Sequence, residues 1–97
     1  MRVIGKRVLF EKAARHADAK IPLQVWLETA KEAQWTSLED IRREFPATDM
    51  LRHIAIFNIK GNAYRLIVRM VFKVKKIYVK EFLTHAEYDK DRWKKWL

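Results

Sequence analysis

The spacing of apolar residues changes from helical to alternating near residue 53, and this change limits the fold more than any other feature of the 97-residue sequence. In the first half, apolar residues recur at the three- and four-residue spacing of a helix with one buried side. This stripe consists of Leu23, Trp26, Leu27, Ala30 and Ala33. In the second half, segments 54–60, 63–72 and 77–84 are rich in Ile, Val, Tyr and Phe and alternate apolar with polar residues, as strands do. The order predicts an α+β fold in which N-terminal helices pack on one face of a mainly antiparallel sheet.

Local signals place the ends of the helices. Helical spacing predicts a first helix over 7–15, and Pro22 suits the first turn of the second helix. The segment Thr36–Glu39 has the form of a capping box, which predicts a short helix ending before Pro46. The same form recurs at Thr84–Glu87 and predicts a last helical turn that begins where the third strand ends.

Two hairpins set the expected register of the sheet. The dipeptide Gly61-Asn62 suits a two-residue turn, because glycine supplies a positive φ and asparagine tolerates one. Asn58 then faces Arg65, and a second turn around Lys75 puts Arg65 opposite Thr84. The face to be covered by the helices carries Phe57, Ile59, Tyr64, Leu66, Val68, Met70, Phe72, Ile77, Val79 and Leu83, together with Glu81. The face expected to meet solvent carries Asn58, Lys60, Arg65, Arg69, Tyr78, Lys80, Phe82 and Thr84.

A formal net charge of +9 and a pI near 10.0 indicate a polyanionic partner. The excess is uneven, since residues 1–51 hold nine basic and eight acidic side chains whereas residues 52–97 hold twelve and four. The chain contains no cysteine, which excludes disulfides, thiolate zinc sites and thiol catalysis. No segment has the pattern of a signal peptide or a membrane span, so we expect a single cytoplasmic domain over residues 1–97.

Polar side chains converge at one end of the face expected to meet solvent. Asn58, Arg65 and Thr84 form a row across three strands, and His85 follows at the start of the last helix. Tyr88 lies about one turn further along that helix. The groups needed to cleave RNA without a metal are then present: a base for the 2′-OH proton, cations for the phosphorane and an acid for the leaving 5′ oxygen.

Each of these residues also has a simpler explanation. His85 has the pattern of an ordinary surface histidine, Tyr88 of a core aromatic residue, and Lys60 of a solvated cation beside a turn. A metal site built from His85, Glu87 and Asp89 is disfavoured, because a two-residue spacing spreads ligands around a helix. The expectation therefore includes neither a metal ion nor a cofactor.

Four segments together resemble HigB-type toxins of the RelE/ParE superfamily. They are 2–5, 22–35, 57–68 (FNIKGNAYRLIV) and 84–90 (THAEYDK), so the likeness covers essentially the full chain. The resemblance implies a small toxin whose helices pack on one face of a curved antiparallel sheet. It implies metal-independent cleavage of mRNA in the ribosomal A site. It also implies a HigA-type helix-turn-helix antitoxin that neutralises the toxin and represses the operon with it, so that operator DNA is contacted only through the antitoxin.

The resemblance also assigns roles to residues. Carried over motif by motif, the catalytic residues are Lys60, Arg65, His85 and Tyr88. Further RNA contacts are expected from Asn58, Asn62, Arg69, Lys73 and Lys80. RelE-type members have an arginine cluster after the C-terminal histidine, but here Ala86 and Glu87 follow, so the base can be either His85 or Tyr88. Two alternatives stay open: a ParE-like gyrase poison without nuclease activity, and a non-catalytic RNA- or ribosome-binding module.

Overall fold

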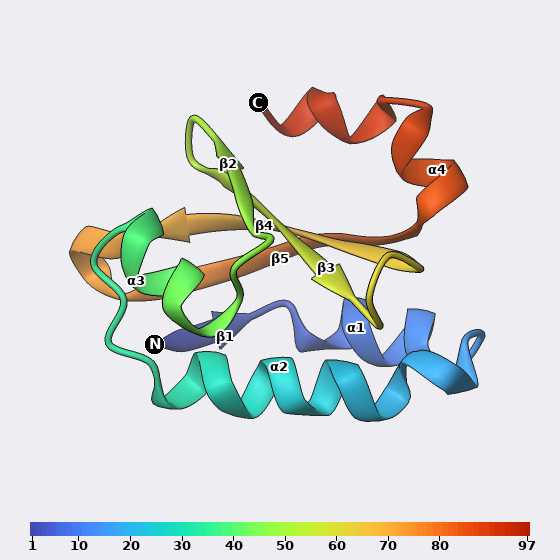
Figure 1. Cartoon of the computed structure of the whole chain (residues 1–97), viewed down its shortest axis with the longest axis horizontal. Coiled ribbons are helices and arrows are strands. Elements are labelled where there is room, and N and C mark those ends of the chain that lie inside the picture. The colour runs from blue at the N-terminus through green and yellow to red at the C-terminus, as the bar shows by residue number, and fades with distance from the viewer.

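A five-stranded sheet forms the centre of the computed structural model, which covers residues 1–97 (Figure 1). Its strands are β1 (Arg2–Ile4), β2 (Asp49–Leu51), β3 (Ile54–Ile59), β4 (Tyr64–Val71) and β5 (Lys76–Thr84), in the spatial order β1-β5-β4-β3-β2. All neighbours are antiparallel except β1, which runs parallel to β5. The three long strands confirm the prediction, and the two edge strands, of three residues each, were not predicted.

The helices lie mainly below the sheet in Figure 1, where α1 and α2 run side by side. The helical elements are α1 (Lys6–Ala13), the 3₁₀ turn η1 (Ala17–Ala19), α2 (Lys20–Glu32), α3 (Leu38–Glu44), the 3₁₀ turn η2 (Phe72–Val74), α4 (His85–Asp89) and the 3₁₀ helix η3 (Arg92–Trp96). The predicted α1 and α2 are confirmed with shifted ends. No helix is long and apolar enough to cross a membrane.

The capping box predicted for α3 at Thr36 is wrong by one residue. Ser37 is the N-cap, and its hydroxyl accepts a hydrogen bond from the Asp40 backbone N–H at 3.3 Å. The Thr36 hydroxyl instead donates to the Asp40 carboxylate at 2.8 Å. The capping box predicted for α4 is confirmed.

The main core lies between α1, α2 and the face of the sheet that they cover. Trp26 of α2 is fully buried and meets Phe57 of β3 edge to face, with ring centroids 5.4 Å apart. Trp35 stacks on the same Phe57 ring at 6.1 Å. Full burial of a large side chain stabilises the fold by about 1.5–3 kcal/mol, so this aromatic cluster fixes α2 against the sheet.

The register of the second hairpin differs from the prediction because β5 contains a β-bulge. Val79 pairs with Val68 and Glu81 pairs with Ile67, which leaves Lys80 as an extra, unpaired residue. Beyond the bulge the alternation of β5 reverses. Phe82 therefore joins the core under the helices and Leu83 joins the opposite face, the reverse of the prediction.

The bulge also changes the row of polar residues. Arg65 pairs with Leu83, so the predicted pairing of Arg65 with Thr84 is wrong, and Tyr64 is the partner of Thr84. The first hairpin does have the predicted register, with Asn58 opposite Arg65. Gly61 adopts the expected positive φ of 60° in its turn.

A second, smaller core covers the face that we expected to meet solvent. Trp93 of η3 is 2% exposed and belongs to a cluster with Ile54, Ile56, Ile67 and Leu83. The segment containing α4 and η3 thus folds back across the middle of this face, above the sheet in Figure 1. Only the two ends of the face remain open.

Candidate active site

Arg65 is the buried centre of the candidate site. Its side chain leaves the face of β4 opposite α1 and α2, yet the residue is only 8% exposed, so the predicted solvent exposure is wrong. The Nη1 group donates to the backbone oxygens of Asn62 at 3.2 Å and Tyr64 at 3.1 Å, and Nη2 donates to the Asn62 side-chain oxygen. A guanidinium has five N–H groups, so Nε–H and one Nη2–H are left without a protein acceptor.

Tyr88 of α4 covers the guanidinium. The Arg65 Cζ atom lies 5.2 Å from the centroid of the Tyr88 ring, within the range of a cation–π contact. On its other side the ring stacks on Trp93, with centroids 5.3 Å apart and planes 9° apart. Burial raises the pKa of the Tyr88 phenol, and the positive charge of Arg65 opposes this shift. The hydroxyl is therefore protonated at neutral pH and can act as a proton donor.

His85 is placed beside the turn of the first hairpin by the start of α4. Its backbone N–H donates to the Ala63 carbonyl at 3.0 Å, which joins α4 to the turn that contains Asn62. The capping box holds this end of α4, because the Thr84 N–H donates to the Glu87 carboxylate at 2.9 Å and lowers the pKa of that acid. The imidazole is exposed, with Nε2 3.7 Å from an Asp89 carboxylate oxygen.

Lys60 is not on the face that carries Arg65, and that prediction is wrong. Its left-handed backbone, with φ 53°, ends β3 and directs the side chain to Asp18 of η1. The ammonium lies 2.7 Å from the Asp18 carboxylate, which also accepts a 2.6 Å hydrogen bond from the Tyr64 hydroxyl. The hydrogen bond from Lys60, followed by that from Tyr64, lowers the pKa of Asp18. The same carboxylate raises the pKa of Tyr64.

The residues expected to contact RNA fall into separate groups. Asn58 and Asn62 lie beside Arg65, and Asn62 holds its guanidinium. Arg69 and Lys80 lie at the opposite end of the same face, and Lys73 is exposed in η2. The continuous track of cations implied by the predicted sheet is therefore divided. Trp93, packed on the second core, lies between the two ends. Trp96, which donates to Glu81 at 2.9 Å, lies beside Arg69 at the far end.

The sequence did not predict that Trp93 and Trp96 pack on the face that carries Arg65, nor that Glu81 lies on that face. Glu81 was assigned to the helix-covered core, where it would have had no partner. The bulge places it on the opposite face, where it accepts from Trp96 and lies 4.0 Å from Lys95. The adjacent apolar pair Phe82-Leu83, which breaks strict alternation, is the sequence signal that could have revealed the bulge.

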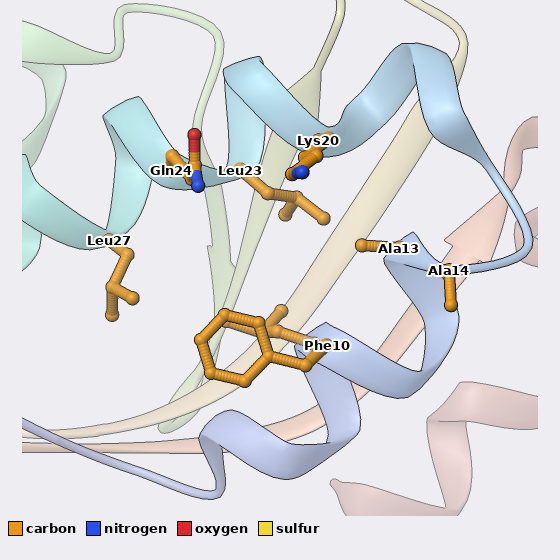
Figure 2. Close-up of a pocket in the computed structure, with 8 residues that line it drawn as sticks. Phe10, Ala13, Ala14, Lys20, Leu23, Gln24 and Leu27 are labelled. Carbon is orange, nitrogen blue, oxygen red and sulfur yellow. The ribbon is translucent and has the colours of Figure 1, made fainter.

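An apolar groove of about 320 Å³ lies between α1 and α2 but does not form this site. Figure 2 shows Phe10, Leu23 and Leu27 directed into the space between the two helices. Lys20 is the only charged side chain that lines it. With a single lysine and no histidine, tyrosine or carboxylate, the groove lacks the set of groups that phosphodiester cleavage requires. No three His, Cys, Asp or Glu side chains lie together as a metal-binding group.

The fold, together with the segments 57–68 and 84–90, defines a RelE-like toxin. A family model described as HigB_toxin, RelE-like toxic component of a toxin-antitoxin system, matches residues 19–91, and the chain belongs to this family. It is similar to the mRNA interferase toxin HigB of Escherichia coli (strain K12), with 27% identity over 92% of this chain and 88% of that protein. It is also similar to the mRNA interferase HigB of Escherichia coli O6:H1, with 29% identity over 93% of this chain and 90% of that protein.

Proposed function

We propose that this toxin is an mRNA interferase that cleaves translated mRNA on the ribosome and requires no metal ion. The observation that carries the proposal is the contact between α4 and the first hairpin. This contact places the protonated phenol of Tyr88 over the permanently charged guanidinium of Arg65, and it starts α4 with the exposed His85 beside the turn of the hairpin. The two relatives reported above are both named mRNA interferases, which supports the same activity.

In the proposed reaction the ribose 2′-OH attacks the adjacent phosphorus, and the bond to the 5′ oxygen of the next nucleotide breaks. His85 takes the 2′-OH proton, because imidazole exchanges protons closest to neutral pH. The two free N–H groups of Arg65 stabilise the charge on the phosphorane. Tyr88 donates its proton to the leaving 5′ oxygen. The products are a 2′,3′-cyclic phosphate and a free 5′-OH end.

Asn62 and Lys60 support this reaction from the turn. Asn62 positions Arg65 through two hydrogen bonds, so it acts through the guanidinium. Lys60 is half exposed beside Asp18 and is proposed to attract the phosphate backbone and not to transfer protons. Asn58, Arg69, Lys73 and Lys80 complete the proposed RNA contacts.

Primer extension on an mRNA translated in a purified system with the toxin tests the proposal. New 5′ ends within translated codons are expected for wild type. Tyr88→Phe and His85→Gln are expected to slow cleavage by roughly 10²- to 10⁴-fold, the usual contribution of a general acid or base. Tyr78→Phe is the matched control, since it also removes one hydroxyl and keeps the ring. Intact messages, together with gyrase-dependent DNA cleavage, would replace this proposal by the gyrase poison.

We also propose that the partner is a HigA-type antitoxin with a helix-turn-helix domain, and that the toxin acts in the cytoplasm. Membership of a family of toxin-antitoxin toxic components supports a protein partner. Co-purification with the product of the adjacent open reading frame tests this. A mobility shift of operator DNA is expected with the complex and not with the toxin alone.

A further inference from the structure

A small cavity lies at the end of the sheet face remote from Arg65. It has a volume of about 170 Å³ and is lined by Arg52, His53, Ile54, Arg69, Trp96 and Leu97. Sites for free small molecules usually enclose roughly 300–1,000 Å³, so this cavity suits a single chemical group of a larger ligand. No Asp or Glu side chain lines it.

Arg69, one of the two arginines of the cavity, has no acidic partner. It lies on β4 between Ile54 and Tyr78 of the neighbouring strands, is exposed, and takes part in no ion pair. Arg52 donates one hydrogen bond, at 3.2 Å, to a main-chain oxygen of Leu97, the last residue of the printed sequence, and its other N–H groups have no protein acceptor. An unpaired guanidinium beside a second one with free N–H groups can hold a phosphate.

The backbone at Arg52 indicates that the cation is needed at this position. Arg52 occupies the β2–β3 turn with φ 55°, a left-handed conformation that favours glycine. Lys60 and Lys75 have φ 53° and 55° in the next two hairpin turns. Each hairpin of the sheet thus places a cation where glycine would be less strained. Residues held in such conformations cluster at functional sites.

An exposed aromatic ring completes the cavity. Trp96 is 38% exposed and its indole N–H is fixed by Glu81, so the ring has a defined orientation. The Lys80 and Lys95 ammonium groups lie 5.0 and 5.3 Å from its centroid. A fixed aromatic ring surrounded by cations is typical of sites that stack an unpaired base and hold its phosphate.

We propose that Arg52, Arg69 and Trp96 form a second RNA site, which binds one unpaired nucleotide. The arginines hold its phosphate and Trp96 stacks on its base. The inference rests on the proposed function only in taking RNA as the substrate. Trp93, packed on Ile54, Ile56, Ile67 and Leu83, separates this site from Arg65. Variants here should therefore weaken the affinity for RNA.

The test measures affinity for a fluorescent single-stranded RNA oligonucleotide and, separately, for vacant ribosomes, across a salt series. Arg69→Ala and Arg52→Gly are expected to weaken binding. Each should reduce the slope of log affinity against log salt by about 0.7, the value for one phosphate contact on a single strand. Trp96→Ala should weaken binding by roughly 5- to 150-fold. Arg43→Ala, an exposed arginine on α3, is the charge-matched control.

Arg52→Gly distinguishes a loss of RNA binding from a loss of folding, because glycine relieves the strain of the left-handed backbone at this position. Its melting temperature should equal or exceed that of wild type while its RNA affinity falls.

The two binding measurements, with the oligonucleotide and with vacant ribosomes, distinguish messenger RNA from ribosomal RNA as the ligand. Weakened oligonucleotide binding assigns the site to the message, and weakened ribosome binding alone assigns it to ribosomal RNA. If Arg69→Ala and Arg52→Gly bind both probes as tightly as Arg43→Ala, the site does not exist. If wild type binds RNA through Arg69 but leaves messages intact, the second site stands and the proposed cleavage is wrong.

Discussion

Replacement of Arg65 by alanine should destabilise the fold strongly, in addition to removing the guanidinium that we propose stabilises the phosphorane. The cation–π contact with Tyr88 is largely shielded from water and is worth about 1–2 kcal/mol. The buried Tyr64 carbonyl loses its charged donor, at about 1–2 kcal/mol, whereas the Asn62 oxygens in the exposed turn are rehydrated. The expected loss is therefore about 3 kcal/mol of unfolding free energy. For a domain of this size, that lowers the melting temperature by roughly 12–24 °C.

Urea unfolding followed by tryptophan fluorescence, together with thermal circular dichroism, measures this loss. Arg69→Ala is the matched control, because the same change on the same strand at an exposed position should alter stability by at most about 0.5 kcal/mol. The burial argument is refuted if Arg65→Ala unfolds within about 0.5 kcal/mol of wild type. A loss of toxicity in Arg65→Ala cells must accordingly be compared with the amount of folded protein before it is assigned to chemistry.

Three further changes test other parts of the fold. Gly5→Ala should cost about 1–3 kcal/mol of stability, because Gly5 has φ 93° and a Cβ there would lie 3.0 Å from the Val79 oxygen, whereas Gly61→Ala, with open space around it, should cost less. The pKa of Asp18 is lowered from 3.8 by hydrogen bonds from a lysine and a tyrosine, so its stabilising effect is present above that pH and is lost as the pH falls through the lowered value. Asp18→Asn should thus be less stable than wild type in urea at pH 7 and converge with it in strong acid; a constant difference would contradict this. Thr84→Ala removes the N-cap of α4 and should cost about 1 kcal/mol, while Thr84→Ser should not.

The parts of the fold predicted from the sequence are those that local patterns determine. The first hairpin has the predicted register because glycine at position 61 adopts the positive φ that a tight turn requires. The last helix begins at the predicted residue because Thr84 and Glu87 satisfy each other's backbone N–H groups. Strand β1 escaped prediction because it is three residues long and pairs in parallel with a strand more than seventy residues away.

The membership of the candidate site stays a prediction, but part of its geometry can be compared with the structure. Arg65 and Tyr88 meet in a cation–π contact, and Trp93 of η3 stacks on the same Tyr88 ring, an arrangement that strand alternation does not encode. Lys60 was misplaced because alternation was continued through a residue whose left-handed backbone had already ended the strand. The backbone conformation of one residue determines the face on which its charged side chain lies, so a charge pattern alone cannot show which cations share a surface.

The single extra residue at Lys80 determines on which side of the sheet Phe82 and Leu83 of β5 lie, just before α4 begins. Without it, the side chains of β5 beyond Val79 would each point to the opposite face of the sheet. We would then expect α4 to leave the strand toward α1 and not toward Arg65. Deletion of Lys80 would restore regular alternation and would release Trp93 into water, a change visible as a red shift of its fluorescence. A bulge disrupts the ladder of hydrogen bonds locally, but this one gives the sheet a second apolar cluster, on the face opposite α1 and α2.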